Sequence, residues 1–420
     1  MKIVSLSTSD KNGGAAISAF RVHQALRQNG MDAHMLVQDQ RSDDPGVHSI
    51  ASNAFDKKLA TARYAWEKLM FLPYERDKSI RFAFSTGISG ASLSKHQLVQ
   101  QADIIHFNWM HQGFMSISEM ERIFKLGKPI VWLLHDMWAF TGGCHYAGES
   151  RGFERECGNC PYLKNPGPND LSHQIWLKKQ KVYSNAPLTI VASSQWLAGE
   201  ARKSSLFGGF NVYAIPTPIN PEEFYPEDKV AARKRFGLNA DKQYLLFGAM
   251  SLGDERKGFK YLKEGVNQLV SEGKLDIEKV ELVIFGKDRP EAREGIPLKV
   301  NFLGQLSKTE DLRAAYNSAD IFVLPSLEDN LPNTIIEALS CGVPSVAFDC
   351  TGVPEIITHE VTGYLAPLRS SGGVAKGIHW VLNHPDPIAL GQSARQHSLE
   401  KFSGQVISEA YRKLYQQLLG

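Results

Sequence analysis

Short apolar runs alternate with helical stretches along the chain, and this alternation constrains the fold most strongly. Each run is long enough for one buried strand. The stretches between them follow the helical period, for example over residues 15–29, 116–126 and 307–317, where Ser307 and Glu310 are expected to form a capping box. Strands alternating with helices are typical of a parallel sheet covered on both faces. The expected strands are residues 2–7, 34–37, 103–107, 129–134, 188–192, 212–215, 244–247, 282–285, 300–303, 321–324 and 345–348.

A cluster of prolines marks the boundary between two predicted domains. Pro216, Pro218, Pro221 and Pro226 lie within eleven residues, which is typical of a linker. The 420 residues of the chain suffice for two domains of ordinary size. We predict an α/β protein with two Rossmann-like, doubly wound parallel-sheet domains facing a cleft, over residues 1–216 and 217–400. Residues 401–420 are expected to form a helix that packs back on the N-terminal domain.

The composition argues against several other classes of protein. A formal net charge of +2 gives no indication of nucleic-acid binding. No apolar run approaches the length of a membrane span. Polar residues interrupt residues 1–30, so we expect no secretory signal. Five cysteines are an odd number, which favours a reducing compartment. We therefore expect a cytoplasmic protein.

Residues 319–344 form the most informative single stretch. It reads as a strand over 321–324, a loop with Glu328 and Asp329, and a helix whose first turn contains Pro332. An open α/β sheet binds ligands at such strand ends, and the helix start offers free N–H groups and a positive dipole to an anion. Glu337, about one turn into the helix, is expected to point back toward that ligand.

Two further strand-to-helix loops are candidates for binding phosphate. Backbone N–H groups of the loop 12–14, which contains Gly13 and Gly14, could approach a phosphate or a sugar hydroxyl; the alternative is a tight turn that needs a positive φ. The loop lacks the spaced glycines of a dinucleotide site, so nicotinamide binding is disfavoured. Arg256 and Lys257 open a helix whose dipole they oppose, which an anionic ligand would compensate. The alternative is a solvated charge run.

His135 is the first residue after a very apolar strand. In that position a histidine can donate to a substrate hydroxyl or transfer a proton. The alternative is a structural histidine whose hydrogen bonds are satisfied within the fold.

A glycine-rich insertion over residues 142–161 contains three of the five cysteines. Cys157 and Cys160 have the spacing of a metal knuckle, and Cys144 precedes them. With His145 as the nearest fourth ligand, we expect a structural zinc site. The alternatives are a partial site without metal, or redox-active thiols. No partner for an activated water lies nearby, so a catalytic zinc is disfavoured.

The stretch 53–84 is helical, aromatic and basic. It is a candidate surface for a membrane or an acceptor. Aromatic residues at helical spacing more often belong to a core, so we expect Trp66 and its aromatic neighbours to be buried.

The stretch 319–344 resembles the retaining, nucleotide-sugar-dependent glycosyltransferases of family 4, whose two Rossmann-like domains adopt the GT-B arrangement. That family carries two acids separated by seven residues, followed by a short glycine-proline motif. The first acid falls here on Asp329, with Glu328 one residue further out, and Ser345 replaces a common valine. The matching residues are Glu337, Ala338, Gly342, Pro344 and Val346.

The resemblance extends over most of the chain. Gly13 and Gly14 match the family's N-terminal glycine loop, His135 its active-site histidine, and Lys257 its phosphate-binding lysine. The family's usual arginine falls on Leu252, and Arg256 is the candidate substitute. Residues 351–355 and 362–365 resemble two of its turns. Residues 135–161 resemble a bacterial polysaccharide-biosynthesis subgroup with four cysteines, one of which is Ser150 here.

The resemblance implies a role for each matching residue. Arg256, Lys257 and the helix start at Asn333 and Thr334 would bind the donor diphosphate, which Gly14 would approach. Glu337 would bind the ribose, Asp329 or Glu328 the donor sugar, and His135 the transferred sugar. Cations and a helix dipole would stabilise the leaving diphosphate, so no divalent metal or other cofactor is required for catalysis.

The implied function is that of a retaining, metal-independent hexosyltransferase. It would move a sugar from a nucleotide sugar to a glycan or a lipid-linked glycan in surface polysaccharide biosynthesis, with peripheral association at the inner face of the cell membrane. The alternatives are a nucleotide-sugar epimerase of the same architecture and a non-catalytic protein that binds nucleotide sugars.

Overall fold

The computed structural model describes residues 1–420, apart from the side chain of Ala292. Backbone contacts divide the chain into two compact units. The N-terminal unit consists of Met1–Thr217 together with Ile407–Gly420, and the C-terminal unit is Pro218–Val406. The division in the proline-rich stretch therefore follows Thr217.

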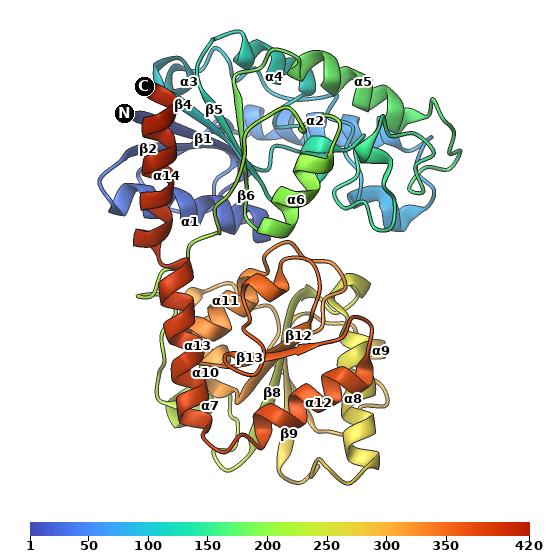
Figure 1. The fold of residues 1–420 in the computed structure, drawn as a ribbon, viewed down its shortest axis with the longest axis vertical. Helices are drawn as coiled ribbons and strands as arrows, with labels where there is room; N and C mark the ends of the chain where they lie inside the picture. The colour runs from blue at the N-terminus through green and yellow to red at the C-terminus, as the bar shows by residue number, and fades with distance from the viewer. The chain divides into compact units, whose positions relative to one another are not determined.

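The N-terminal unit is built on a parallel sheet of seven strands in the order β3-β2-β1-β4-β5-β6-β7 (Figure 1). The strands are β1 Lys2–Ser9, β2 Asp32–Asp39, β3 Val47–Ser49, β4 Ile104–Phe107, β5 Ile130–Leu134, β6 Leu188–Ala192 and β7 Val212–Ala214. The α-helices are α1 Gly14–Gln28, α2 Ala54–Phe71, α3 Gln97–Gln101, α4 Ile117–Phe124, α5 Leu171–Tyr183, α6 Gln195–Lys203 and α14 Gly404–Leu419, and short 3-10 helices cover Lys78–Phe82, Trp138–Phe140 and Gly152–Glu154.

The C-terminal unit repeats this plan with six strands in the order β10-β9-β8-β11-β12-β13. The strands are β8 Gln243–Ser251, β9 Val280–Lys287, β10 Val300–Phe302, β11 Ile321–Leu324, β12 Ser345–Phe348 and β13 Gly363–Ala366. The α-helices are α7 Lys229–Arg235, α8 Phe259–Ser271, α9 Pro290–Arg293, α10 Thr309–Ser318, α11 Asn333–Ser340, α12 Ser371–Leu382 and α13 Pro387–Phe402, with 3-10 helices over Glu255–Lys257 and Val353–Glu355. The prediction of two parallel-sheet α/β domains is confirmed.

In each sheet the strand order reverses at one point, between β1 and β4 and between β8 and β11. The helices that follow the two strands at such a point cover opposite faces of the sheet, which leaves a crevice at the carboxyl ends of the strands. The loops after β1, β4, β8 and β11 are therefore the positions at which this fold binds ligands.

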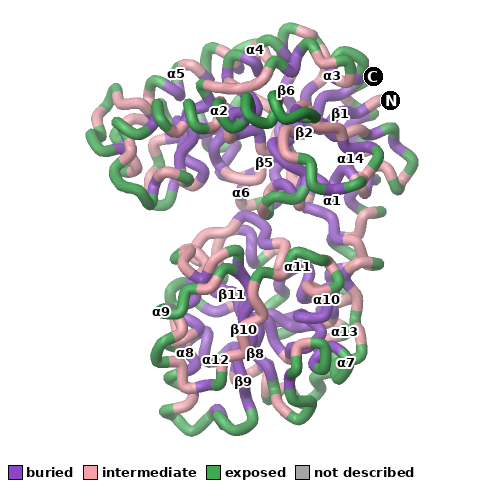
Figure 2. The backbone as a smooth tube through the Cα atoms, turned by 180° about the vertical axis from the view of Figure 1, so that it is seen from behind, coloured by how far each residue is buried: buried purple, intermediate pink, exposed green. Residues whose placement is uncertain are grey.

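The sheets are buried, and the last helix completes the core of the N-terminal unit. Figure 2 shows the strands largely in purple, the colour of buried residues. Tyr411, Leu414 and Tyr415 of α14 pack against Ile3 of β1 and Leu26 of α1. Among the described helices, none combines the length and the apolarity that a membrane span requires.

Three local features differ from the sequence predictions. The predicted capping box is wrong, because α10 begins after Lys308, whose side chain makes no capping hydrogen bond. Pro332 is the N-cap residue of α11 rather than a member of its first turn. The core prediction for 53–84 is wrong for Trp66, which is 53% exposed. Figure 2 draws much of α2 in green, the colour of exposed residues.

Candidate active site

The loops after β8 and β11 meet at the reversal point of the C-terminal sheet. Gly258 has a φ of 69°, and a Cβ atom there would collide with the carbonyl oxygen of Pro325. Glycine therefore allows the two loops to approach closely. The amide of Leu327 donates to the carbonyl of Arg256 at 2.7 Å. The Arg256 guanidinium in turn donates to the carbonyl of Glu328 at 3.2 Å, so the cationic and acidic loops form one structure.

Lys257 and Asp329 are brought together at this point. The ammonium group of Lys257 donates to Oδ2 of Asp329 in a half-buried ion pair. Thr351 donates from Oγ1 to the backbone carbonyl of Asp329 at 2.6 Å and thereby fixes the acidic loop. Of the two candidate first acids, Asp329 is the one whose carboxylate contacts the predicted phosphate-binding lysine.

The helix α11 begins immediately after this loop. Its N-cap residue, Pro332, makes no side-chain capping bond. The start of a helix favours an anion through its N–H groups and dipole, and this start lies at Asn333 and Thr334. Glu337 follows one turn later and is only 5% exposed. The hydroxyl of Tyr316 on α10 donates to Oε2 of Glu337 at 2.7 Å. No sequence pattern connects these two residues, because their contact depends on how α10 packs against α11.

The N-terminal unit places three predicted residues, Gly13, Gly14 and His135, at its own strand ends. Gly13 has a φ of 97°, which supports the turn reading, and α1 begins at Gly14. A Cβ atom on either glycine would meet nothing within 4 Å, so there is open space at the start of α1. After β5, Nε2 of His135 lies 3.4 Å from Oδ1 of Asn108, which follows β4. Burial lowers the pKa of His135 to about 4, so its imidazole is neutral at neutral pH.

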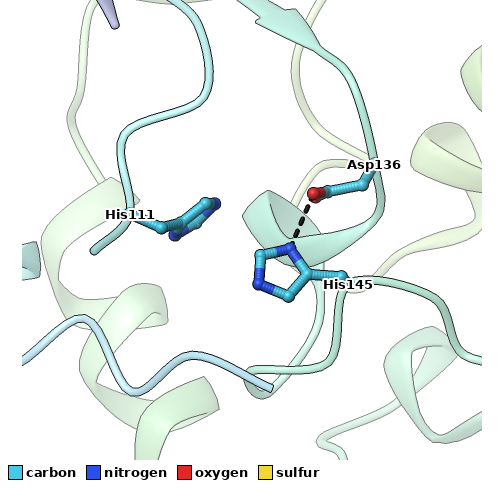
Figure 3. A group of neighbouring side chains, drawn as sticks. All are labelled: His111, Asp136 and His145. Carbon is cyan, nitrogen blue, oxygen red and sulfur yellow. Dashed lines mark hydrogen bonds and ion pairs between the residues drawn. The ribbon is translucent and has the colours of Figure 1, made fainter. Parts of the chain in front are cut away.

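The residue after His135 anchors a buried polar cluster that the sequence did not reveal (Figure 3). Asp136 Oδ2 accepts from Nδ1 of His145 at 2.6 Å and from the indole of Trp109 at 2.9 Å, while Oδ1 accepts from the amide of Trp138. The His145 interaction helps to hold the pKa of Asp136 well below its usual range despite burial. The ligand atoms of His111, Asp136 and His145 lie within 4.8 Å of one another. We interpret the cluster as the support of the loop that carries His135, since three N–H donors satisfy Asp136.

The structure does not bring His145 to the cysteines. Its second ring nitrogen, Nε2, lies 2.9 Å from Oγ of Ser85, so both nitrogens have partners elsewhere. Cys144, Cys157 and Cys160 instead line a separate small cavity. Burial raises the pKa of Cys157 and of Cys160 to about 11, so these thiols lack the thiolate character of redox-active cysteines.

Family models and known proteins match this chain over most of its length. Residues 12–223 match the model described as glycosyltransferase family 4, and residues 241–384 match that of glycosyl transferases group 1. The chain is 24% identical to the putative colanic acid biosynthesis glycosyl transferase WcaC of Escherichia coli K12, with 100% of both chains covered.

Solved structures share the fold of the whole chain. Sucrose-phosphate synthase from Thermosynechococcus elongatus superposes with a TM-score of 0.66 at 19% identity, covering 100% of this chain and 99% of that one. Alr3699/HepE from Anabaena, solved with UDP and glucose, superposes with a TM-score of 0.64 at 16% identity, covering 99% of this chain and 100% of that one. The GT-B fold class is thereby confirmed.

Proposed function

The chain belongs to glycosyltransferase family 4, and from this membership we propose that it transfers a hexose, with retention of anomeric configuration, from a nucleotide sugar to a glycan or lipid-linked glycan of a surface polysaccharide. The full-length similarity to a putative colanic acid glycosyl transferase supports the polysaccharide class. One observation carries the assignment of the donor site. The side chains of Lys257 and Asp329 converge at the β8/β11 reversal point, and the loop that carries Asp329 leads to the start of α11.

The charges at this point suit a donor diphosphate. In our proposal Lys257, Arg256 and the N–H groups at Asn333 and Thr334 bind its oxygens, as a helix start binds anions. Preorganised cations and a helix dipole stabilise the charge that develops on the leaving diphosphate, so we propose that transfer needs no divalent metal. Glu337, which accepts a hydrogen bond from Tyr316, binds the ribose in our proposal.

For the sugar, the family resemblance implies a role for residues of each unit. Asp329, or Glu328 beside it, accepts hydrogen bonds from the donor sugar's hydroxyls. His135 contacts the transferred sugar as a neutral imidazole, since its pKa of about 4 keeps it uncharged at neutral pH. It therefore acts as a hydrogen-bond partner rather than as a fixed positive charge. Gly14 at the start of α1 leaves room for a phosphate to approach.

An exposed face of α2 supports peripheral association with the inner face of the cell membrane from the cytoplasm. Phe55, Leu59, Trp66 and Leu69 recur at spacings that keep them on one side of the helix, and each is exposed. The buried side of α2 is held against the rest of the unit by Glu67, whose carboxylate accepts a hydrogen bond from the amide of Gly87 at 2.9 Å.

The positive charges near this face favour an anionic lipid surface as its binding partner. Lys57 and Lys58 are exposed beside the apolar residues, and Lys78 is exposed in the 3-10 helix that follows. An apolar helical face flanked by cations is the pattern of interfacial helices on anionic membranes. This surface would bring the enzyme to a lipid-linked acceptor.

Product analysis tests the proposed reaction directly. The protein is incubated with a panel of nucleotide sugars and lipid-linked glycan acceptors in the presence of EDTA, and the linkage formed is assigned by NMR. We expect a product whose anomeric configuration equals that of the donor, at a rate that EDTA does not change. An inverted product or a rate restored only by added metal would contradict the proposal. Epimer formation without acceptor would favour the epimerase alternative, and tight nucleotide binding without turnover the non-catalytic one.

A further inference from the structure

The three cysteines of the glycine-rich insertion share one small cavity. Cys144, Cys157 and Cys160 line it together with Ser150 and Ser172, and its volume is about 20 Å³. Such a volume holds one water-sized sphere. None of the three thiols forms a disulfide. The cavity that the three thiols line is therefore no larger than one small ion or water.

The backbone around Cys157 forms a tight turn, and one backbone amide donates to its sulfur. Cys157, Gly158 and Asn159 all have positive φ values, of 55°, 91° and 49°. At Gly158 a Cβ atom would press on Pro168, so the turn depends on glycine. The amide of Gly142 donates to Sγ of Cys157 at 3.1 Å. Backbone N–H groups directed at sulfur stabilise a thiolate more than a thiol.

A buried lysine lies next to the cysteines without a carboxylate partner. Lys179 on α5 is 0% exposed, and its ammonium group donates to the carbonyl oxygens of Trp138 and Thr141, the latter at 3.0 Å. It also lies 3.4 Å from the centroid of the Trp138 ring. Across the described side chains, no Asp or Glu forms an ion pair with it. An unpaired buried charge costs several kcal/mol, so the arrangement calls for an anion nearby.

We propose that Cys144, Cys157 and Cys160 bind one Zn²⁺ as thiolates, and that Lys179 is the counter-cation of the resulting complex. Three thiolates and one divalent ion carry a net charge of −1, which the ammonium group of Lys179 balances. Binding releases three thiol protons to solvent, and no bond is oxidised or reduced. Thiolate ligands favour zinc over the hard cations that carboxylates bind.

This ligand set excludes His145, whose two ring nitrogens contact Asp136 and Ser85. Ser150, which also lines the cavity, or a water would supply an oxygen as the fourth ligand. The three sulfur atoms do not all lie within 4.8 Å of one another. Metal binding must therefore draw the insertion together. The proposal does not depend on the donor, the acceptor or the reaction.

Metal analysis of the full-length protein tests the proposal. We expect about one zinc per chain in protein purified without chelator. After zinc removal, titration with Co²⁺ should give sulfur-to-cobalt charge-transfer absorption that saturates at about one equivalent. Folded wild-type protein that holds no zinc and shows no such absorption would overturn the proposal.

Variants separate the ligands from the counter-cation and from His145. Cys157→Ser and Cys160→Ser should lose the zinc, while Cys350→Ser, which changes a half-buried free thiol of the other unit, should retain it. Lys179→Met should weaken zinc binding by about tenfold or more, and Lys179→Arg should weaken it less. His145→Gln should leave the zinc content unchanged. If folded His145→Gln protein loses its zinc, or folded Cys157→Ser and Cys160→Ser proteins keep theirs, the ligand set is wrong.

Discussion

Lys257 and Asp329 are 72 residues apart in sequence, and their side chains form an ion pair where the loops after β8 and β11 meet. The same lysine is the residue to which we assign the donor's phosphate. In the free protein Asp329 therefore competes with a phosphate for the ammonium group of Lys257. Removal of the Asp329 carboxylate should therefore affect the binding of the nucleotide and the binding of the sugar differently.

The substitution Asp329→Asn tests this competition. Because it removes the carboxylate that neutralises Lys257, it should leave the affinity for a free nucleoside diphosphate unchanged or raise it. Turnover of the complete donor should fall by about 100-fold, since the contact to the sugar's hydroxyls is lost. Calorimetry and initial rates measure the two effects. Asp349→Asn, at an exposed position after β12, is the matched control. Weaker binding of the diphosphate by Asp329→Asn would contradict the assignment.

Tyr316 should act as a positioning residue for Glu337. Tyr316→Phe removes the 2.7 Å hydrogen bond to a buried carboxylate, which is worth about 1.5–3 kcal/mol. We expect KM for the donor to rise while kcat changes little, because the bond orients a group that binds the ribose. Tyr261→Phe, in a buried tyrosine of α8, is the control for general loss of stability. An unchanged KM, or a fall confined to kcat, would show that Glu337 does not depend on Tyr316.

The free energy of unfolding should fall as the pH decreases below about 6.5. Burial lowers the pKa of His23 and His135 to about 4 and that of His106 to about 3, from an ordinary value of 6.5. The unfolded chain therefore binds more protons between pH 6.5 and these values, and stability is lost progressively across that window. A pKa difference of one between the folded and the unfolded chain changes the free energy of unfolding by about 1.4 kcal/mol.

Denaturant unfolding at several pH values measures this effect. His106→Gln should give a flatter dependence of the free energy of unfolding on pH than the wild type. The residue is suited to this test because it is 0% exposed and its ring contacts the hydroxyl of Tyr415 of α14. A wild-type stability that stays constant from pH 7 to about pH 4.5 would contradict the proposed burial of these neutral histidines.

The apolar face of α2 should bind anionic vesicles. We expect the double variant Trp66→Ser, Leu69→Ser to lose about tenfold or more in vesicle affinity, because two large exposed apolar side chains no longer enter the interface. Sedimentation with phosphatidylglycerol vesicles measures it, and phosphatidylcholine vesicles should bind more weakly. Leu177→Ser, at an exposed leucine of α5, is the matched control. Equal binding by the double variant and the wild type would remove α2 from the membrane surface.

The parts of the fold that follow from local sequence were predictable. The strand β11 at Ile321–Leu324 and the strand β6 at Leu188–Ala192 have the predicted limits, because a buried parallel strand is a continuous apolar run bounded by polar residues. The sequence predicted that Asp329 and Lys257 lie near each other, since both residues follow strand ends. Its geometry depends on the strand order, which no single stretch contains.

Other features depend on packing that the sequence does not display. Val47–Ser49 and Gly363–Ala366 are short edge strands, and neither has the apolar run of a buried strand. The contact of Tyr316 with Glu337 and the cluster around Asp136 join residues from different elements. Trp66 is exposed although its helical spacing is that of a core residue, because the buried side of α2 is the one that carries Glu67.

In our proposal, Glu337 and the loops after β8 and β11 form a nucleotide-sugar site. Calorimetric titration of the wild type and of Glu337→Ala with UDP, GDP and ADP tests this assignment. We predict that the wild type binds one of these with a stoichiometry of about 1:1, and that Glu337→Ala binds the same nucleotide about 10- to 100-fold more weakly, as loss of hydrogen bonds to a charged group requires. Equal affinity of a folded Glu337→Ala protein would contradict the claim.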